Sequence, residues 1–352
     1  ADPRSPSPFL AARPFVRGAG FHLAWFHRAR AIDRGSERSV LPHPYHAADV
    51  PTPTLETPRT KSATTRPRTV LIVGAGIAGI AAALRLAEQG VRATLLETRR
   101  TLGGRATSFQ DVRSGETLDN CQHVALACCV NYLDFLARLG VADKLHWTDA
   151  THWVEAGGRA NTIQPGFLPP PAHLSGSFAG AKFLSLADKA AIARAMLAIL
   201  RADRANFRGR TFADFLANTR QPASAIAKFW TPIVVSACNL PCDRVAASCA
   251  LHVFQDGFLA TKRASRMAVA AVPLVDLYDP AENAICRSGG ELRLGVSIDR
   301  LDAHTATTSG GETLTADAVI CAVPPERAAK IIDPAIRGHA EEPGGDELFH
   351  IF

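Results

Sequence analysis

The clearest pattern of apolar and polar positions lies in residues 70–97. A short run rich in β-branched side chains, Val70–Val73, predicts a strand that is buried on both faces. Apolar positions then recur at helical spacing as far as Gly90, a residue type that commonly ends helices. A second apolar run follows and ends at Glu97. The pattern therefore predicts a strand–helix–strand unit.

Three glycines in the first turn of this unit form the pattern G-x-G-x-x-G. In such a turn the first glycine allows the tight bend, the second lets backbone approach a pyrophosphate, and the third lets the helix pack on the strand. The pyrophosphate then rests on free N–H groups at the helix N-terminus. Glu97 lies 23 residues after Gly74 (97 − 74), where an acid that binds ribose belongs. The predicted cofactor contacts at the turn are Gly74, Gly76, Ile77, Ala78 and Gly79.

Composition narrows the class of protein. The chain has 352 residues, of which 47% are hydrophobic and 20% charged, and this is ordinary for a soluble globular protein of two structural domains. The net charge of +6 is modest and much of it lies in the Arg-rich N-terminal segment, so we expect no nucleic-acid partner. No apolar run reaches 18 residues, which argues against a spanning helix.

Eight cysteines occur, mostly inside apolar stretches and without paired C-x-x-C spacing. We interpret them as buried, reduced thiols and expect no metal site. Reduced cysteines favour a cytoplasmic protein, and contact with the inner face of the plasma membrane is one option.

Residues 1–67 differ from the rest because they are rich in Pro, Arg, Ser and Thr and lack sustained periodicity. We predict a disordered tail, or sequence upstream of the true start, with no fixed structure before about Arg68. A targeting peptide is the alternative interpretation.

A Gly-Gly-Arg sequence follows the predicted ribose acid within a few residues. The segment resembles the extended flavin-binding signature of the amine oxidase and phytoene desaturase superfamily. The resemblance implies FAD as the cofactor, with close backbone approach at Gly103 and Gly104 and a phosphate contact from Arg105.

Four polar side chains are packed into the five residues 119–123, between apolar flanks, and would be costly to bury unpaired. This stretch resembles the D-N-G-Q-H-V element of the hydroxysqualene dehydroxylases, also described as squalene-associated FAD-dependent desaturases. The resemblance suggests His123 as a candidate catalytic acid, with Asn120 and Gln122 orienting it or the flavin. Cys121 stands where that family usually has glycine, which predicts strain if the backbone there is left-handed, or crowding of the flavin.

Helical patterns dominate the region assigned to a substrate domain, residues 166–284. Its motif order again resembles the dehydroxylases, and we interpret its aromatic stripes as core. The proline-rich, apolar segment 165–184 is predicted either to shape a lipid entrance on a membrane or to pack on the core.

The chain then returns to strand patterns, and the last of these reads A-D-A-V-I-C-A-V-P-P. The resemblance implies that backbone near Ile298 meets the adenine. The superfamily's closing G-D-rich segment and helix have no counterpart after Asp333, so we expect a C-terminally truncated member.

The predicted fold class is α/β, with a Rossmann-like (GR2-type) FAD domain at 68–165 and 285–352 and an inserted helical domain. The resemblance implies reductive dehydroxylation of hydroxysqualene, an apolar isoprenoid, to squalene for hopanoid or sterol synthesis, with the electron donor left open. The alternatives are a carotenoid desaturase, a flavin amine oxidase and an inactive remnant.

Overall fold

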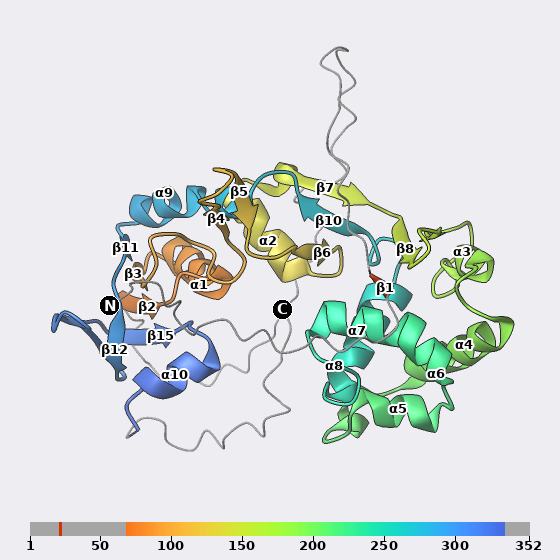
Figure 1. The fold of residues 1–352 in the computed structure, drawn as a ribbon. Coiled ribbons are helices and arrows are strands. Elements are labelled where there is room, and N and C mark those ends of the chain that lie inside the picture. The colour runs from red at the N-terminus through yellow and green to blue at the C-terminus, as the bar shows by residue number, and fades with distance from the viewer. Residues whose placement is uncertain (1–20, 23–67, 335–352) are drawn as a thin grey trace, which may run out of the picture. The chain divides into compact units, whose positions relative to one another are not determined.

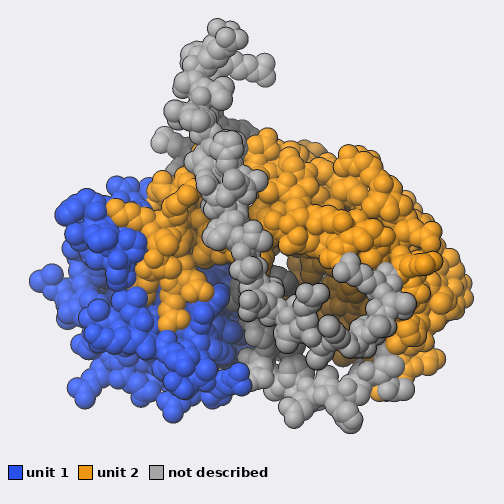
Figure 2. All heavy atoms as spheres, turned by 180° about the vertical axis from the view of Figure 1, so that it is seen from behind, with its two compact units in different colours: residues 1–33, 150–254 blue, residues 34–149, 255–352 orange. Residues whose placement is uncertain are grey.

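The computed structural model describes residues 21–22 and 68–334, which fall into two compact units (Figure 1). Of the described residues, 21–22 and 150–254 belong to unit 1, and 68–149 and 255–334 belong to unit 2 (Figure 2). Helices and sheets are both present, so the fold class is α/β, as the sequence predicts.

A four-stranded parallel sheet forms the centre of unit 2 (Figure 1). Its strand order is β11-β3-β2-β15, and every neighbouring pair is parallel. The strands are β2 (Thr69–Val73), β3 (Arg92–Glu97), β11 (Glu291–Leu294) and β15 (Ala318–Cys321). The two central strands are the two that the sequence pattern predicts, and the strand with the A-V-P-P ending pairs beside them.

Both faces of this sheet are covered, which explains why the central strand β2 is continuously apolar from Val70 to Val73. Val70 and Ile72 lie in the core beneath the helices, whereas Leu71, Val73 and Leu96 lie in a second core on the opposite face. Side chains alternate along a strand, so the four-residue apolar run Val70–Val73 supplies both cores at once.

The helical side of the sheet carries α1 (Ile77–Glu88), α2 (Val130–Leu139) and α9 (Pro280–Arg287). The opposite side carries a three-stranded antiparallel sheet and α10 (Pro325–Ile331). That sheet contains β12 (Ile298–Leu301), β13 (Thr305–Thr308) and β14 (Thr313–Thr315).

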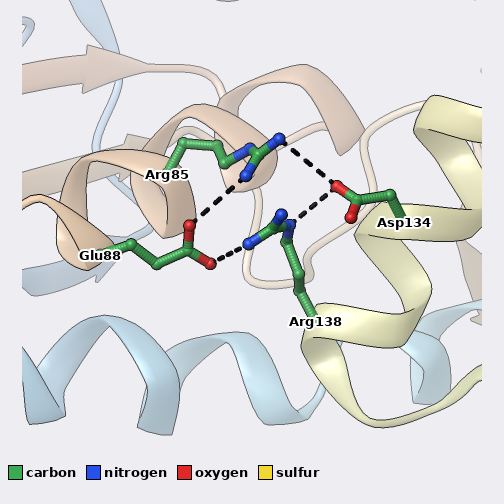
Figure 3. A network of polar contacts seen from close by, with 4 residues as sticks. All are labelled: Arg85, Glu88, Asp134 and Arg138. Atoms are coloured by element: carbon green, nitrogen blue, oxygen red, sulfur yellow. Dashed lines mark hydrogen bonds and ion pairs between the residues drawn. The ribbon is translucent and has the colours of Figure 1, made fainter. Parts of the chain in front are cut away.

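A ring of four charged residues joins α1 to α2 at the surface (Figure 3). Glu88 pairs with Arg85, at 3.5 Å, and with Arg138. Asp134 closes the ring through Arg138 at 2.7 Å and Arg85 at 3.6 Å. Each carboxylate therefore lies between two guanidinium groups, and the ring aligns the two helices more than any single exposed pair would.

Short antiparallel strands complete unit 2. One sheet has the order β6-β10-β7, and β4 pairs with β5. These strands are β4 (Ser108–Gln110), β5 (Thr117–Asp119), β6 (Val124–Leu126), β7 (Leu145–Thr148) and β10 (Met267–Ala270). Two 3₁₀ turns, Ala142–Lys144 and Leu274–Leu277, lie between the larger elements.

Unit 1 is mainly helical, with one small sheet in the order β1-β8-β9. Its strands are β1 (Phe21–His22), β8 (Thr151–Glu155) and β9 (Ala160–Ile163). Its helices are α3 (Ser175–Gly180), α4 (Leu186–Arg201), α5 (Phe212–Asn218), α6 (Ala223–Ala225), α7 (Thr231–Cys238) and α8 (Ala247–His252). A 3₁₀ turn, Arg204–Phe207, and a π-helical stretch, Ile226–Trp230, lie among them, and a second π-helical stretch, Val253–Leu259, runs across the boundary into unit 2.

Aromatic side chains fill the core of unit 1. Trp230, Phe212 and Phe254 are fully buried and meet at centroid distances of 5.0–5.8 Å. The indole of Trp230 donates a hydrogen bond of 2.9 Å to Gln221, which satisfies its buried polar atom. The interpretation of these aromatic stripes as core is therefore confirmed for these three residues.

Two helices of unit 1 begin with reciprocal capping boxes. Ser185 and Asp188 form a reciprocal capping box at α4, and Thr211 and Asp214 form one at α5. In the proline-rich segment before α4, Phe183 is buried whereas Phe167 is 91% exposed.

The unit boundaries differ from the predicted domain boundaries. The hairpin of β8 and β9 belongs to unit 1, because Trp153 stacks on Phe183 and Phe229 there. Residues 255–284 belong to unit 2, because β10 pairs with β6 and β7 and α9 packs on α1. Long-range strand pairing determines where the units divide, and the helical periodicity of the sequence does not reveal this pairing.

The prediction of no fixed structure before Arg68 is wrong at two residues. Phe21 and His22 form β1, which pairs antiparallel with Glu155 and Val154 of β8. The free edge of β8 offers unpaired backbone groups that a short extended segment satisfies. The remainder of that prediction lies outside the described residues.

Within the described part of the chain, no helix combines the length and apolar character needed to cross a membrane.

We expect Gly79→Ala to destabilise the protein by about 1–3 kcal/mol or more, because its new methyl group would lie 1.9 Å from the Gly74 carbonyl oxygen. Urea unfolding of the purified variant measures this. Gly176→Ala in α3 is the matched control, since nothing lies within 4 Å of its added Cβ. Equal unfolding midpoints for the two variants would contradict the expectation.

Candidate functional site

The turn between β2 and α1 is built on backbone contacts that exclude side chains. Gly74 has a left-handed backbone (φ +102°), and its N–H donates to the Leu96 carbonyl at 2.8 Å. A Cβ at Gly74 would lie 3.0 Å from both the Ala322 carbonyl oxygen and Val323 Cγ1. The first glycine of the motif is therefore required by both its dihedral angle and the chain that packs behind it.

Gly76 is different, because the protein itself leaves space there. It has an ordinary φ of −73°, and the nearest atom to an added Cβ is Gly104 Cα at 3.9 Å. Folding does not demand a glycine at this position. The open space beside it suits a ligand that must approach the backbone.

The N-terminus of α1 is free to bind an anion. No side chain caps this twelve-residue helix, and its first turn contains no acidic residue. The starts of α4 and α5, by contrast, are closed by their own side chains. The first N–H groups of α1, at Ile77 to Gly79, thus combine unsatisfied donors with the positive end of the helix dipole.

Glu97 lies at the carboxyl end of β3, next to this turn. Its half-buried carboxylate accepts the Ala75 N–H at 2.7 Å and the Arg99 N–H at 2.9 Å. These two bonds fix the carboxylate in place and use one acceptor site on each oxygen. The remaining acceptor sites can bind ribose hydroxyl groups.

A second glycine turn lies directly against the first. Gly103 donates its N–H to the Ala75 carbonyl at 2.9 Å and forms a parallel bridge with Gly76. Both Gly103 (φ +93°) and Gly104 (φ +61°) are left-handed, and a Cβ at Gly104 would lie 3.0 Å from Gly76 Cα. Arg105 follows at an exposed position.

Asn120 is attached to this second turn. Its side-chain amide donates to the Arg105 carbonyl at 2.9 Å, and its N–H donates to the Thr107 carbonyl at 2.8 Å. The tertiary structure thus joins the predicted catalytic stretch to the predicted phosphate-binding stretch through one side chain.

The other members of the stretch lie further along the same loop. His123 is half-buried, with Nδ1 2.9 Å from the Cys121 carbonyl oxygen, and Gln122 is exposed. Among described non-glycine residues, left-handed backbone occurs at Arg220 and Asn239, so Cys121 carries no strain of that kind. The predicted catalytic roles of these residues, and crowding of the flavin by Cys121, stay predictions.

Ile298 is linked to the end of β3 through the preceding segment. The Val296 N–H donates to the Glu97 carbonyl at 2.9 Å. The Ile298 side chain is buried, and its carbonyl accepts a hydrogen bond from the Arg327 guanidinium at 3.3 Å. The contact of the Ile298 backbone with adenine stays a prediction.

Comparison with known proteins identifies the family. The family model "Flavin containing amine oxidoreductase" matches residues 77–343. This chain belongs to the flavin-containing amine oxidoreductase family.

Curated relatives of this family member include carotenoid desaturases. It is 28% identical over 238 residues to a zeta-carotene desaturase of Solanum lycopersicum, covering 64% of this chain and 40% of that protein. It is 27% identical over 279 residues to a zeta-carotene desaturase of Synechocystis, covering 72% and 57%. It is 24% identical over 276 residues to a 15-cis-phytoene desaturase of Arabidopsis thaliana, covering 74% and 48%. The chain thus spans about half the length of these relatives.

Solved structures support the fold. An oxidoreductase of Methanosarcina mazei aligns with a TM-score of 0.55 at 17% identity, covering 75% of this chain and 61% of that one. Cyclohexylamine oxidase of Brevibacterium oxydans aligns with a TM-score of 0.51 at 21% identity, covering 76% and 60%.

FAD is the cofactor of this flavin-containing amine oxidoreductase, and the described residues fit its dinucleotide part. The uncapped start of α1 suits the pyrophosphate, the open space at Gly76 permits its approach, and Glu97 retains acceptors for ribose. Arg105 is exposed on the adjoining turn, where its fixed positive charge can reach a phosphate.

Sequence analysis missed Arg99 as part of the site. Its N–H donates to Glu97, and its guanidinium donates to the Gly104 carbonyl at 3.3 Å. Arg99 therefore connects the ribose acid to the second glycine turn. Its position two residues after Glu97 is the only signal in the sequence, and an ordinary surface arginine would give the same signal.

No disulfide joins the eight cysteines, all of which lie in the described part of the chain, but the prediction that they are buried is correct only for Cys238 and Cys242. Cys128 and Cys129 are half-buried neighbours just before α2, and Cys129 is the N-cap of that helix. A hydrogen bond from the Cys128 thiol lowers the pKa of Cys129, and the same contact, together with burial, raises the pKa of Cys128.

We expect iodoacetamide to alkylate Cys129 faster than the exposed Cys286 at neutral pH, because a lowered pKa keeps the thiolate present as the pH falls. Peptide mass spectrometry over a pH series measures the two rates. Cys128→Ala removes the donor and is expected to move the Cys129 profile to higher pH. An unchanged profile in that variant would contradict the assignment.

We expect Gly76→Ala to leave the unfolding free energy of the apo-protein within about 1 kcal/mol, because its Cβ meets only ordinary contacts. The same methyl group would stand where the pyrophosphate approaches and weaken FAD binding by about tenfold or more. Titration of flavin fluorescence and urea unfolding measure the two effects separately. Unaltered FAD affinity would contradict the assigned site.

Proposed function

We propose that this protein is an FAD-dependent oxidoreductase that acts on an apolar isoprenoid substrate. The observation that carries the proposal is the uncapped N-terminus of α1, bordered by Glu97 and the Gly103–Gly104 turn, in a member of this family. The substrate class is supported by the carotenoid desaturases among its relatives.

Within this class we propose reductive dehydroxylation of hydroxysqualene to squalene. The supporting observation is the polar stretch from Asn120 to His123, whose first member is hydrogen-bonded to the Arg105 carbonyl. A second candidate, desaturation of a carotenoid, is supported by the zeta-carotene and phytoene desaturases among the relatives.

FAD, when bound, supplies hydride transfer to or from carbon. The residues of this chain have two tasks in the dehydroxylation. Asn120 holds the loop that carries His123 against the cofactor turn. In this role the Nδ1–H of His123 donates to the Cys121 carbonyl, and Nε2, which lies 3.7 Å from Cys121 Sγ, is the nitrogen that would give a proton to the departing hydroxyl group.

Two measurements on the full chain test the proposed function. The purified protein is expected to show the absorption spectrum of an oxidised flavin, either directly or after addition of FAD. Under anaerobic conditions, with the flavin reduced by dithionite, incubation with hydroxysqualene is expected to yield squalene. Desaturated products from phytoene or zeta-carotene with oxidised flavin would select the second candidate, and a protein that takes up no FAD would identify an inactive remnant.

We expect His123→Gln to retain FAD and lose about 10²–10⁴-fold in the rate of dehydroxylation, the usual contribution of a general acid. His152→Gln is the matched control, since His152 lies on β8 of unit 1, where its Nδ1 is 3.1 Å from Thr162 Oγ1. Turnover of His123→Gln at the wild-type rate would remove His123 as the acid.

A further inference from the structure

The two neighbouring glycines of the second turn face different parts of unit 2. A Cβ at Gly104 would lie 3.0 Å from Gly76 Cα, on the side of the first glycine turn. A Cβ at Gly103 would instead lie 2.4 and 2.7 Å from Cε2 and Cδ2 of Tyr278, and 2.8 Å from the Ala106 carbonyl oxygen. The turn is therefore held between the first glycine turn and an aromatic ring 175 residues later in the chain (278 − 103).

The Tyr278 ring is itself fixed. It has no exposed surface, and it lies with its centroid 6.3 Å from that of Phe135 on α2. Its N–H donates to the Val275 carbonyl at 3.0 Å, and its own carbonyl accepts the Ala281 N–H at 2.9 Å at the start of α9. The ring cannot swing away without opening this core.

The backbone just before Tyr278 is tied to the strands that lead to the Asn120 loop. Asp119 accepts the Leu274 N–H at 2.9 Å and the Ser108 hydroxyl at 2.7 Å. Ser108 in turn accepts the Val275 N–H at 3.1 Å. The support of the ring and the support of the candidate catalytic loop are thus the same pair of polar side chains.

The ring, and not the hydroxyl group, makes the contact with the turn. The Tyr278 hydroxyl is buried beside the Tyr132 side chain and takes no part in the contact with Gly103. Burial raises the pKa of Tyr278, so the phenol stays neutral at physiological pH. A phenylalanine ring would fill the same space.

We propose that Tyr278 is a positioning residue for the pyrophosphate half of FAD. Its ring closes the back of Gly103 and keeps the Gly103–Gly104 turn against Gly76, so that the two turns form one rigid edge of the cofactor site. The inference rests on the proposed function only in that it requires FAD to bind at this edge.

The first experiment compares Tyr278→Ala with Tyr278→Phe in the full chain, by titration of flavin fluorescence with apo-protein. We expect Tyr278→Ala to weaken FAD binding by about tenfold or more, and Tyr278→Phe to bind within about twofold of the wild type. Leu136→Ala removes a fully buried side chain from the same core and is the matched control for lost stability. It is expected to lower the urea midpoint without a comparable loss of FAD affinity.

The second experiment is a double-mutant cycle on the apo-protein, measured by urea unfolding. Gly103→Ala adds a methyl group that collides with the ring, and its left-handed strain is the same in any background. We therefore expect Gly103→Ala to shift the midpoint less in Tyr278→Ala than in the wild type. Gly104→Ala faces Gly76 instead and is expected to shift the midpoint equally in both backgrounds.

The outcomes separate the inference from the proposed function. If the wild type takes up no FAD, the proposed function fails and the inference falls with it. If the wild type binds FAD and Tyr278→Ala binds it equally well, the inference alone is overturned. An additive cycle for Gly103 and Tyr278 also overturns it, because the ring then does not hold the turn.

Discussion

The contact on which the rest of unit 2 depends is the close packing of the start of α1 on the end of β2. Gly79 faces the Gly74 carbonyl so closely that no side chain fits between them. This packing directs the uncapped N-terminus of α1 at the space beside Gly76. Glu97 and the second glycine turn contact the same turn, Glu97 at Ala75 and Gly103 at Gly76. An anion-binding site arises here because backbone donors converge where side chains are excluded.

Around that contact the site is assembled from backbone groups more than from side chains. Ala75 donates its N–H to Glu97 and accepts the N–H of Gly103 at its carbonyl, so one residue connects the ribose acid with the second turn. Arg99 makes a second connection of this kind, because its N–H donates to Glu97 and its guanidinium donates to the Gly104 carbonyl. Such a site is held by the α/β core beneath it. Its geometry therefore depends on buried residues that are distant from the motif in sequence, such as Tyr278.

The polar stretch from Asn120 to His123 connects this cofactor site to the chemistry proposed for the protein. Asn120 is bonded to the cofactor turn, and the strand before it is anchored by Asp119 to Leu274. A shift of that loop would move the candidate acid and the phosphate-binding turn together. The proposed reaction needs this coupling, because a proton and a hydride must reach neighbouring atoms of one substrate.

The amino-acid sequence by itself determined the local features of the protein. Alternation of β-branched runs and glycines gave the strand–helix–strand unit, Ser185 and Thr211 gave the helix starts, and Glu97 fell at the end of its strand. These features depend on contacts between residues close in the chain, which periodicity and capping rules describe. The α/β class and the flavin motif follow from the same short-range information.

Only the tertiary structure decided which distant segments complete the site and where the units divide. Because β10 pairs with β6 and β7, residues 255–284 belong to unit 2. The same segment carries Tyr278, whose ring packs against Gly103. Arg99, Tyr278 and the bond from Asn120 to Arg105 carry no pattern in the sequence, since each depends on groups that meet only after the chain has folded. Strand pairing and core packing join residues that are distant in the sequence. The pattern within one segment predicts a strand or a helix, but it does not say which other segment that element packs against.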